Sequence, residues 1–345
     1  MRRVGLHLTD RCQLDCDHCL RDPGREPLDL AFATIEMVLV EASRSLGIAR
    51  VSLTGGEPTL HPRFTDVLDL VVSLGMRWDM VSNGRRFDRV ARWLEERPAR
   101  RDACESVALS MDGASDSTHD AIRGSGQRRE VLGAMAILVD LGVPFEVTAA
   151  VHARNAHEIE AIADEAAALG ASAVRFVMTQ PTGTPLDAGL ALSASAWCEI
   201  RERIRALEGR APIPILTGVG WPEAHPETCA PLRGDTLHLD PRGRLTLCCQ
   251  HAGLPAPAHD LTVVGSAERG LEPLLAPWAA ARRDAVAAGA LEGSWAAFQC
   301  NGCLARFGRP HWTDQGVSGT LAVRERWRGD VERSTLLGRS LKVLT

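Results

Sequence analysis

The sequence of 345 residues contains no tyrosine and a single lysine, Lys342. The lack of tyrosine excludes acid–base or radical chemistry on a phenol side chain. A pyridoxal phosphate enzyme needs a Schiff-base lysine inside a formed pocket, which a lysine so close to the C-terminus does not provide. No apolar run approaches the ~18 residues of a membrane helix, and the first residues lack a secretory signal. These absences predict a soluble, cytoplasmic protein without a membrane partner.

The charge balance also excludes a class of partner. The chain has 39 basic and 44 acidic residues, a net charge of −5, and no basic block. A nucleic-acid-binding surface needs such a block, so no nucleic-acid partner is expected. The fractions of hydrophobic (45%) and charged (24%) residues are those of a globular protein. Since a domain usually has roughly 100–200 residues, the length allows one large domain or a core with a smaller module.

The ten cysteines are numerous for a cytoplasmic chain. In a reducing compartment, cysteine clusters indicate metal sites more often than disulfides. Most of these cysteines fall into two groups, one near each end of the chain. Cys104 and Cys198 stand alone, and we expect both to be packing residues.

Alternating strand and helix patterns fill the first half of the chain. Six strands that alternate with helices predict βαβ units and a parallel sheet. In such a sheet, functional residues follow the carboxyl ends of the strands. The expected strands are 4–8, 51–53, 78–81, 107–110, 144–151 and 173–178, and the expected helices are 32–46, 64–72, 87–94, 130–141 and 157–169.

The pattern changes near residue 180, where a Pro/Gly-rich stretch begins. A further helix is expected over 195–207, and 238–248 is typical of a β-hairpin that turns at Pro241-Arg242-Gly243. The resulting division has four parts: a core over 1–185, a connector over 186–225, a small cysteine-bearing α+β module over 226–310 and a C-terminal tail over 311–345.

Cys12, Cys16 and Cys19 follow the first expected strand. Three thiolates within eight residues can converge on a soft metal or on an iron–sulfur cube. A structural zinc site takes four ligands, and the alternative is therefore a zinc site completed by His18 or by a later cysteine.

This segment resembles the CxxxCxxC signature of radical S-adenosylmethionine (SAM) enzymes. Thr54-Gly55-Gly56-Glu57-Pro58 looks like their GGEP motif, and Ser82-Asn83-Gly84 ends the third strand as in many members. Ser110-Met111-Asp112-Gly113, followed by Arg123-Gly124, looks like their fourth-strand segment. The resemblance covers roughly residues 3–180, and it implies an α/β fold, a partial (β/α)6 TIM-like barrel.

The resemblance further implies a [4Fe–4S] cluster on Cys12, Cys16 and Cys19 and SAM on its open iron. Reductive cleavage of SAM would then yield a 5′-deoxyadenosyl radical that abstracts a substrate hydrogen. Paired glycines allow a close backbone approach, and Glu57 suits the SAM ammonium, although an ordinary turn is the alternative for this motif. The candidate SAM-binding residues are Gly55, Gly56, Glu57, Pro58, Ser82, Asn83, Ser110, Asp112 and Arg123.

The second cysteine group consists of Cys229, Cys248, Cys300 and Cys303. Four thiolates saturate a cubane, and the arrangement resembles the twitch domain, a shortened SPASM domain, with one auxiliary [4Fe–4S] cluster. A zinc ribbon is the alternative. Cys249 is an alternative ligand to Cys248, because adjacent strand residues point to opposite faces.

By this resemblance the protein is a radical SAM oxidoreductase that matures a ribosomal peptide by crosslinking or side-chain oxidation. The alternatives are modification of an aminocyclitol, sugar or nucleoside, and a non-catalytic zinc-binding interaction protein. A flavodoxin or ferredoxin is the expected electron donor. Since only eleven residues precede Cys12 and 42 follow Cys303, a peptide substrate would require a separate leader-recognition protein or be very short. No final acid or base is identified. Trp221, Trp278, Trp295 and Trp312 are expected to pack in the core, with a substrate cavity as the alternative.

Overall fold

The computed structural model describes residues 2–19, 27–180, 189–218, 220–222, 229–249, 263–287, 293–295, 298–306, 311–314 and 316–318. Within these residues one sheet runs in the order β10-β9-β8-β1-β2-β3-β4-β5-β6-β7. Strands β1 to β8 are joined by parallel pairings, and β9 and β10 add antiparallel edges. The strands are β1 (Arg3–His7), β2 (Arg50–Thr54), β3 (Arg77–Ser82), β4 (Cys104–Ser110), β5 (Phe145–Val151), β6 (Ala173–Met178), β7 (Ile215–Thr217), β8 (Thr236–Leu239), β9 (Arg244–Thr246) and β10 (Val263–Ser266).

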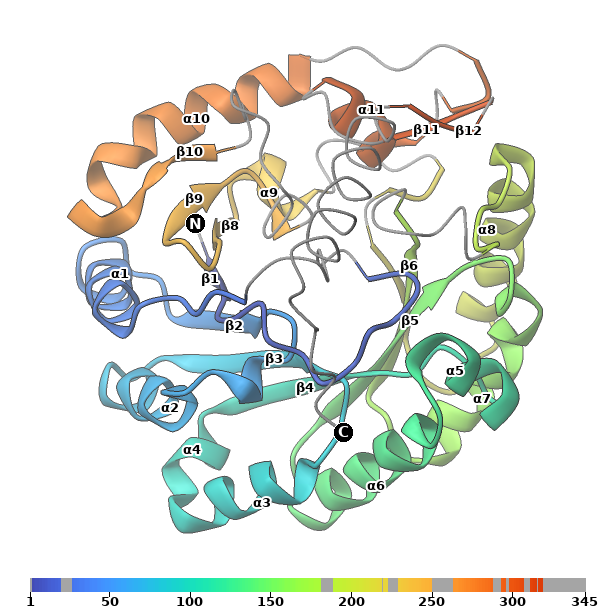
Figure 1. The fold of residues 1–345 in the computed structure, drawn as a ribbon, viewed down its shortest axis with the longest axis horizontal. Helices are drawn as coiled ribbons and strands as arrows, with labels where there is room; N and C mark the ends of the chain where they lie inside the picture. The colour runs from blue at the N-terminus through green and yellow to red at the C-terminus, as the bar shows by residue number, and fades with distance from the viewer. Residues whose placement is uncertain are drawn as a thin grey trace, which may run out of the picture.

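Helices cover the outer face of this curved sheet (Figure 1). Each strand from β1 to β6 is followed by at least one of them, which makes six βα units. The helices are α1 (Phe32–Arg44), α2 (Phe64–Ser73), α3 (Phe87–Glu96), α4 (Pro98–Asp102), α5 (Asp116–Arg123), α6 (Gln127–Asp140), α7 (Ile159–Ala168) and α8 (Ala194–Glu208). The predicted partial (β/α)6 barrel is confirmed.

The core lies between the helices and the sheet, and the apolar spacing of each element explains it. Helix α3 buries Phe87, Val90 and Leu94, which recur at the three-to-four-residue period of one helical face. Leu53 of β2 and Val107 of β4 are fully buried in the same cluster. Each such side chain contributes about 1.5–3 kcal/mol on burial. The core therefore holds the carboxyl ends of β1 to β6 in fixed relative positions.

The sheet continues through the segment that we predicted to be a connector. Residues 186–225 contain α8 and β7, and β7 pairs in parallel with β6. Strand β8, which falls in the predicted cysteine module, pairs in parallel with β1. The sequence pattern did not show β7 because only three residues separate Pro214 from Gly218. Residues 181–188 and 223–228, which include Pro181, Pro185 and Pro226, lie outside the described residues.

The remaining elements flank the β8–β10 side of the sheet and its top in Figure 1. Glu41 of α1 accepts hydrogen bonds from the backbone N–H groups of Leu271 (2.6 Å) and Glu272 (2.7 Å), and it thereby holds the start of α10. Sequence patterns did not predict α10, since Pro277 lies inside it. These elements are α9 (Ala230–Arg233), α10 (Glu272–Ala287), α11 (Gln299–Arg306), β11 (His311–Thr313) and β12 (Gly316–Ser318).

The other residues of the predicted tail lie outside the described part of the chain. Among the helices that the structure describes, none has the length and apolar character needed to cross a membrane.

Candidate radical SAM site

The three N-terminal cysteines lie together in the loop after β1. Each is half-buried, and the backbone N–H of Cys19 donates to the carbonyl of Cys16 (3.0 Å). Burial raises the pKa of Cys16 to about 12, opposed by Arg123, and the nearby Cys12 and Cys19 raise it further. Cys12 Sγ accepts hydrogen bonds from Leu14 N (3.4 Å) and Asn83 Nδ2 (3.7 Å). Three clustered thiols, of which Cys16 is costly to ionise by itself, fit a soft, positively charged metal group that takes thiolates.

Among the described residues, no three or more His, Cys, Asp or Glu side chains are placed closely enough to bind one metal ion together. His18, the alternative fourth zinc ligand, lies with its Nε2 3.5 Å from Asp112 Oδ2 instead.

The glycines of the GGEP segment allow close backbone packing. The N–H groups of Gly56 and Glu57 donate to the carbonyls of Thr9 and Arg11, at 2.7 Å each. A Cβ on Gly55 would lie 2.5 Å from Thr9 O, and one on Gly56 would lie 2.3 Å from Arg11 O. The glycines therefore hold this loop directly against the segment that leads into Cys12.

We expect Gly56→Ala to disrupt the N-terminal cluster site selectively. The new methyl group meets backbone atoms of Asp10 and Arg11, which cannot move without shifting the cysteine loop. With one cubane expected from the sequence at each cysteine group, anaerobically reconstituted protein should lose about half of its iron. Gly133→Ala is the matched control, because nothing lies within 4 Å of its Cβ position, and it should keep full iron content. Equal iron in both variants would contradict this role of Gly56.

Glu57 is almost fully buried, and its carboxylate is used inside the protein. It accepts hydrogen bonds from Thr59 Oγ1 (2.8 Å), Ser82 Oγ (3.1 and 3.2 Å) and Asn83 N (2.9 Å). Burial raises its pKa, and these hydrogen bonds oppose the rise. The carboxylate also caps the short 3-10 helix Pro58–Leu60. The geometry thus places Glu57 as a link between the GGEP loop and the end of β3, whereas the sequence suggested a direct contact with an ammonium group.

Asn83 joins the loops after β1 and β3. In addition to its bond to Cys12 Sγ, its Nδ2 donates to Gln13 Oε1 (3.4 Å). Its backbone carbonyl accepts from Gln127 Nε2 of α6 (2.6 Å). A single hydrogen-bond network therefore connects the cysteine loop, the GGEP loop and the end of β3.

A buried ion pair follows β4, where Ser110 is also buried. Arg123 Nε of α5 donates to Asp112 Oδ2 (2.6 Å), and the side chains are 9% and 0% exposed. Burial alone would raise the pKa of Asp112, but Arg123 and His18 overcome it and hold this pKa well below its usual value. Arg123 Nη2 also lies 3.4 Å from His18 Nε2. The ion pair thus connects the end of β4 to the cysteine loop.

Sequence reasoning missed three polar residues of this site, His152, Asn155 and Gln127. Asn155 Nδ2 donates to the carbonyls of Asp112 and Ala150, at 2.9 Å each. The ring of His152 stacks on that of His18, with centroids 6.1 Å apart. His152 and Asn155 follow the end of β5, and the rule that selected the other candidates would have found them. Gln127 is the first residue of helix α6 and does not follow a strand end, so that rule could not select it.

The C-terminal cysteines gather next to α9 and α11. Cys229 and Cys303 share a small apolar cluster with Leu232, Leu247 and Ala285. Burial raises the pKa of Cys303 to about 12, and nearby Cys229 raises it further. Burial likewise raises the pKa of Cys300, with contributions from Cys229, Cys303 and Cys249.

Cys229, Cys303 and Cys249 thus all act on the pKa of Cys300, and Cys229 and Cys303 share one apolar cluster. Cys249 is the alternative that we weighed against Cys248. Cys248 is half-buried and Cys249 is exposed.

Of the two isolated cysteines, one has the predicted role. Cys104 is the first residue of β4 and is buried in the core, as expected. The prediction for Cys198 was wrong, since it lies within α8 and is exposed at the edge of a pocket. The helical pattern does not distinguish the two faces of α8 at this position. The four tryptophans that we expected to pack in the core, Trp221, Trp278, Trp295 and Trp312, are all buried. Trp295 and Trp312 also line that pocket.

Comparison with known proteins agrees with this site. Residues 6–166 match the model of the radical SAM superfamily. The chain is 28% identical over 264 residues to the PqqA peptide cyclase of Methylorubrum populi, covering 71% of this chain and 65% of that protein. It is 29% identical to the mycofactocin maturase MftC of Mycobacterium ulcerans, covering 52% and 48%. The chain therefore spans less than two thirds of the length of these curated relatives.

Among solved structures, the fold resembles Streptococcus suis SuiB bound to its precursor peptide SuiA. The TM-score is 0.60 at 14% identity, and the match covers 74% of this chain and 61% of SuiB. At 14% identity, this similarity to SuiB shows a shared fold alone.

Proposed function

The chain belongs to the radical SAM superfamily through residues 6–166, and from that premise we propose that it is a radical SAM maturase of a ribosomal peptide. The observation that carries the chemistry is that two sets of polar contacts hold the cysteine loop. One runs from Cys12 through Asn83 to Glu57 of the GGEP loop, and the other runs from His18 to the Asp112–Arg123 pair. The peptide substrate is supported by the relatives, which are named a peptide cyclase and a maturase.

In this proposal Cys12, Cys16 and Cys19 hold a [4Fe–4S] cluster, and SAM binds beside it. When bound there, the cluster and SAM would supply radical chemistry capable of removing a hydrogen atom from an unactivated substrate carbon. The chain's own contribution is orientation and the exclusion of water. Glu57 and Asn83 hold the loops around the thiolates, and the ion pair to Asp112 fixes the Arg123 guanidinium near the cysteine loop.

We propose further that the C-terminal cysteines hold one auxiliary [4Fe–4S] cluster. The convergence of Cys229, Cys300 and Cys303 with Cys249 supports this, and Cys248 or Cys249 completes the set. A flavodoxin or ferredoxin would supply the reducing electron, and the substrate would be either a very short peptide or one whose leader a separate protein recognises. We also propose that the chain divides into a core over 1–185, a connector over 186–225 and a cysteine module over 226–310.

The proposal is tested with anaerobically reconstituted enzyme, reductant, SAM and the deuterated peptide encoded next to the gene. Deuterium in 5′-deoxyadenosine and a peptide mass reduced by hydrogen loss are the expected results. Turnover of a sugar or nucleoside in place of the peptide would overturn the peptide assignment.

Glu57→Ala should weaken SAM binding by about tenfold or more while both clusters persist. The family resemblance implies that Glu57 binds the SAM ammonium, and the substitution would remove that charge-assisted hydrogen bond, worth roughly 1.5–3 kcal/mol. It also removes the acceptor of Asn83 N and Ser82 Oγ. Equilibrium dialysis of labelled SAM measures the change. Ser82→Ala, which removes one of these donors, should give a smaller loss in the same direction. Unchanged SAM affinity in Glu57→Ala would show that this carboxylate does not support the site.

A further inference from the structure

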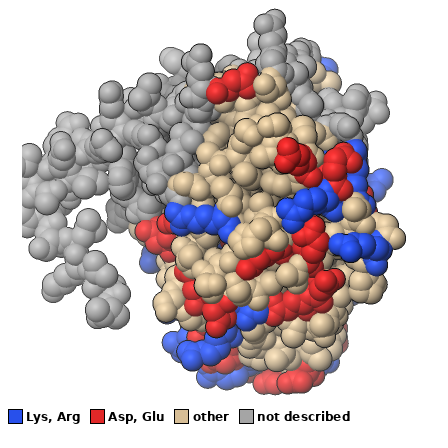
Figure 2. Space-filling model, turned by 90° about the vertical axis from the view of Figure 1, so that its right-hand side faces the viewer, with Lys and Arg blue, Asp and Glu red and all other residues tan. Residues whose placement is uncertain are grey.

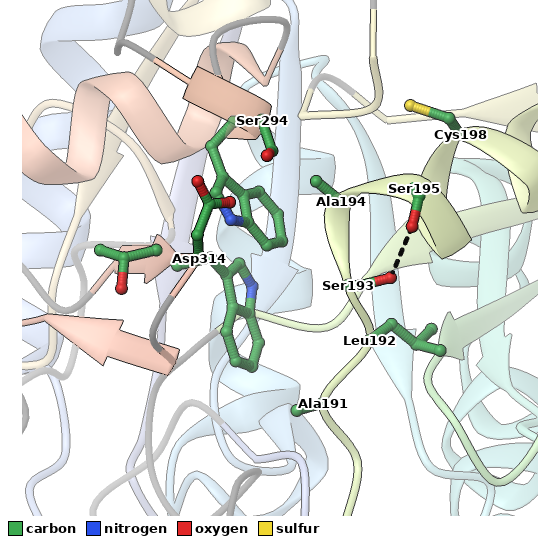
Figure 3. Close-up of a pocket in the computed structure, with 11 residues that line it drawn as sticks. Ala191, Leu192, Ser193, Ala194, Ser195, Cys198, Ser294 and Asp314 are labelled. Carbon is green, nitrogen blue, oxygen red and sulfur yellow. Dashed lines mark hydrogen bonds between the residues drawn. The ribbon is translucent and has the colours of Figure 1, made fainter.

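A second candidate site lies outside the barrel, between α8 and the C-terminal elements. It is a pocket of about 490 Å³, within the usual range of ligand sites. Ser193, Ser195 and Cys198 form one wall, and Ser294 and Asp314 lie on the opposite wall (Figure 3). None of the candidate SAM-site residues lines this pocket.

The pocket has the features of a site for a cation. Among the described residues that line the pocket, Asp314 is the one with a carboxylate, and none is a Lys or Arg. The side chain of Asp314 is exposed. Within the described part of the chain Asp314 forms no ion pair. The indole rings of Trp295 and Trp312, which stack with centroids 6.1 Å apart, also line the pocket. The negative face of an indole ring attracts a cation, and a carboxylate beside it adds charge complementarity.

A second observation shows unused hydrogen-bonding capacity at the same wall. The Nε1 atoms of Trp295 and Trp312 are buried, and neither has a hydrogen-bond partner among the residues that the structure describes. Buried indole N–H groups usually find an acceptor.

The surface on this side of the molecule carries charges of both signs. On the side of the molecule that carries α7 and α8, acidic and basic side chains are intermixed, and uncharged residues cover much of the area above them (Figure 2). The basic residues of that surface are used in pairs such as Arg203–Glu160 (2.5 Å) between α8 and α7. The whole chain carries a net charge of −5.

The pocket is connected to both cysteine groups. The lining residue Ala191 follows Leu190 in the chain. The carbonyl of Leu190 accepts a hydrogen bond from the backbone N–H of Ala153 (3.2 Å), in the loop after β5. Arg154 in that loop pairs with Asp17 between the cluster cysteines (3.3 Å).

On the other side, Asn301 lies between Cys300 and Cys303 and binds the backbone of Trp312 through two hydrogen bonds, of 2.8 and 2.6 Å. A ligand in the pocket would therefore contact segments that are hydrogen-bonded to the neighbours of both cysteine groups.

We propose that this pocket binds an arginine side chain of the substrate peptide and anchors the peptide beside the barrel. The inference rests on the proposed peptide-maturase function, and it adds a specificity-determining subsite outside the radical SAM site. Asp314 pairs with the guanidinium, and Trp295 and Trp312 form the aromatic wall.

The test uses holoenzyme with 5-fluorotryptophan and its fluorine NMR signals, the signals of Trp295 and Trp312 being assigned from their Trp→Phe variants. The probe is N-acetyl-arginine amide, and its isosteric, uncharged control is N-acetyl-citrulline amide. We expect a saturable shift of both signals with the arginine probe and an affinity about tenfold lower for the citrulline probe, corresponding to the loss of about 1.4 kcal/mol. Asp314→Asn should lower the affinity for the arginine probe about tenfold as well. Asp140→Asn, an exposed carboxylate at the end of α6, is the matched control and should not change it.

Equal affinity for the two probes would overturn the assignment to a cation, and the absence of any saturable shift would overturn the site. These readouts do not need turnover, so they are separate from the proposed function. SAM cleavage in the absence of peptide tests the radical SAM chemistry by itself. If that cleavage occurs and an arginine-to-citrulline change in the peptide leaves its KM unchanged, the pocket is not a substrate subsite.

Discussion

Replacing Cys12, Cys16 and Cys19 together by alanine is expected to abolish SAM cleavage and to leave about four of about eight irons in the reconstituted protein. The three thiols cluster in the loop after β1, and no other described cysteine lies in that loop. The auxiliary site is formed by a different part of the chain, so its cubane should remain. Iron and labile-sulfide analysis, together with 5′-deoxyadenosine formation, measures both effects.

The control for this triple variant is Gly133→Ala, which adds a methyl group in α6 at a position with nothing within 4 Å of the new Cβ. It should keep all iron and the full rate of SAM cleavage. Stoichiometric zinc in the wild-type protein, without iron–sulfur absorbance, would refute the assignment of both sites. An unchanged iron content in the triple variant would refute the N-terminal site alone.

Arg123→Leu is expected to destabilise the fold by about 3–5 kcal/mol, because it leaves the Asp112 carboxylate buried without its ionic partner. The side chain of Asp112 is fully buried, and its Oδ1 already accepts the N–H of Ala150 (2.8 Å). Water cannot replace the guanidinium at this position. A lower apparent Tm in anaerobic thermal unfolding measures the effect.

The double variant Asp112→Asn/Arg123→Leu separates the loss of an ion pair from the loss of packing. Asparagine keeps the acceptor for Ala150 N and removes the unpaired charge, so the double variant should be more stable than Arg123→Leu alone. A double variant that is less stable by the sum of both single effects would show that the charges do not interact in this way.

Hydrophobic periodicity was sufficient to predict most of the barrel. The expected strand over 173–178 coincides with β6, and the expected helix over 195–207 lies within α8. Both succeed because one face of each element is apolar at its own period. Strand β7 and helix α10 were not predicted, since a three-residue strand has no period and Pro277 interrupts the helical pattern of α10.

The sequence predicted which residues belong to the candidate site, and the structure added the contacts that these residues make with one another. The strand-end rule placed the cysteines, Glu57 and Asp112 on one edge of the sheet. It did not show that Glu57 is buried against Ser82 and Asn83, because the spacing between motifs contains no information on which loop turns inward.

The amino-acid sequence by itself determined the order of the βα units, the positions of the motifs at strand ends and the two cysteine groups. These are local properties, since periodicity and residue spacing are set along the chain. Only the tertiary structure decided which distant side chains meet. The pair of Asp112 with Arg123, the stacking of His152 on His18 and the pocket between α8 and Trp312 are long-range contacts. They arise because the packed core brings segments together at an angle and depth that no local pattern specifies.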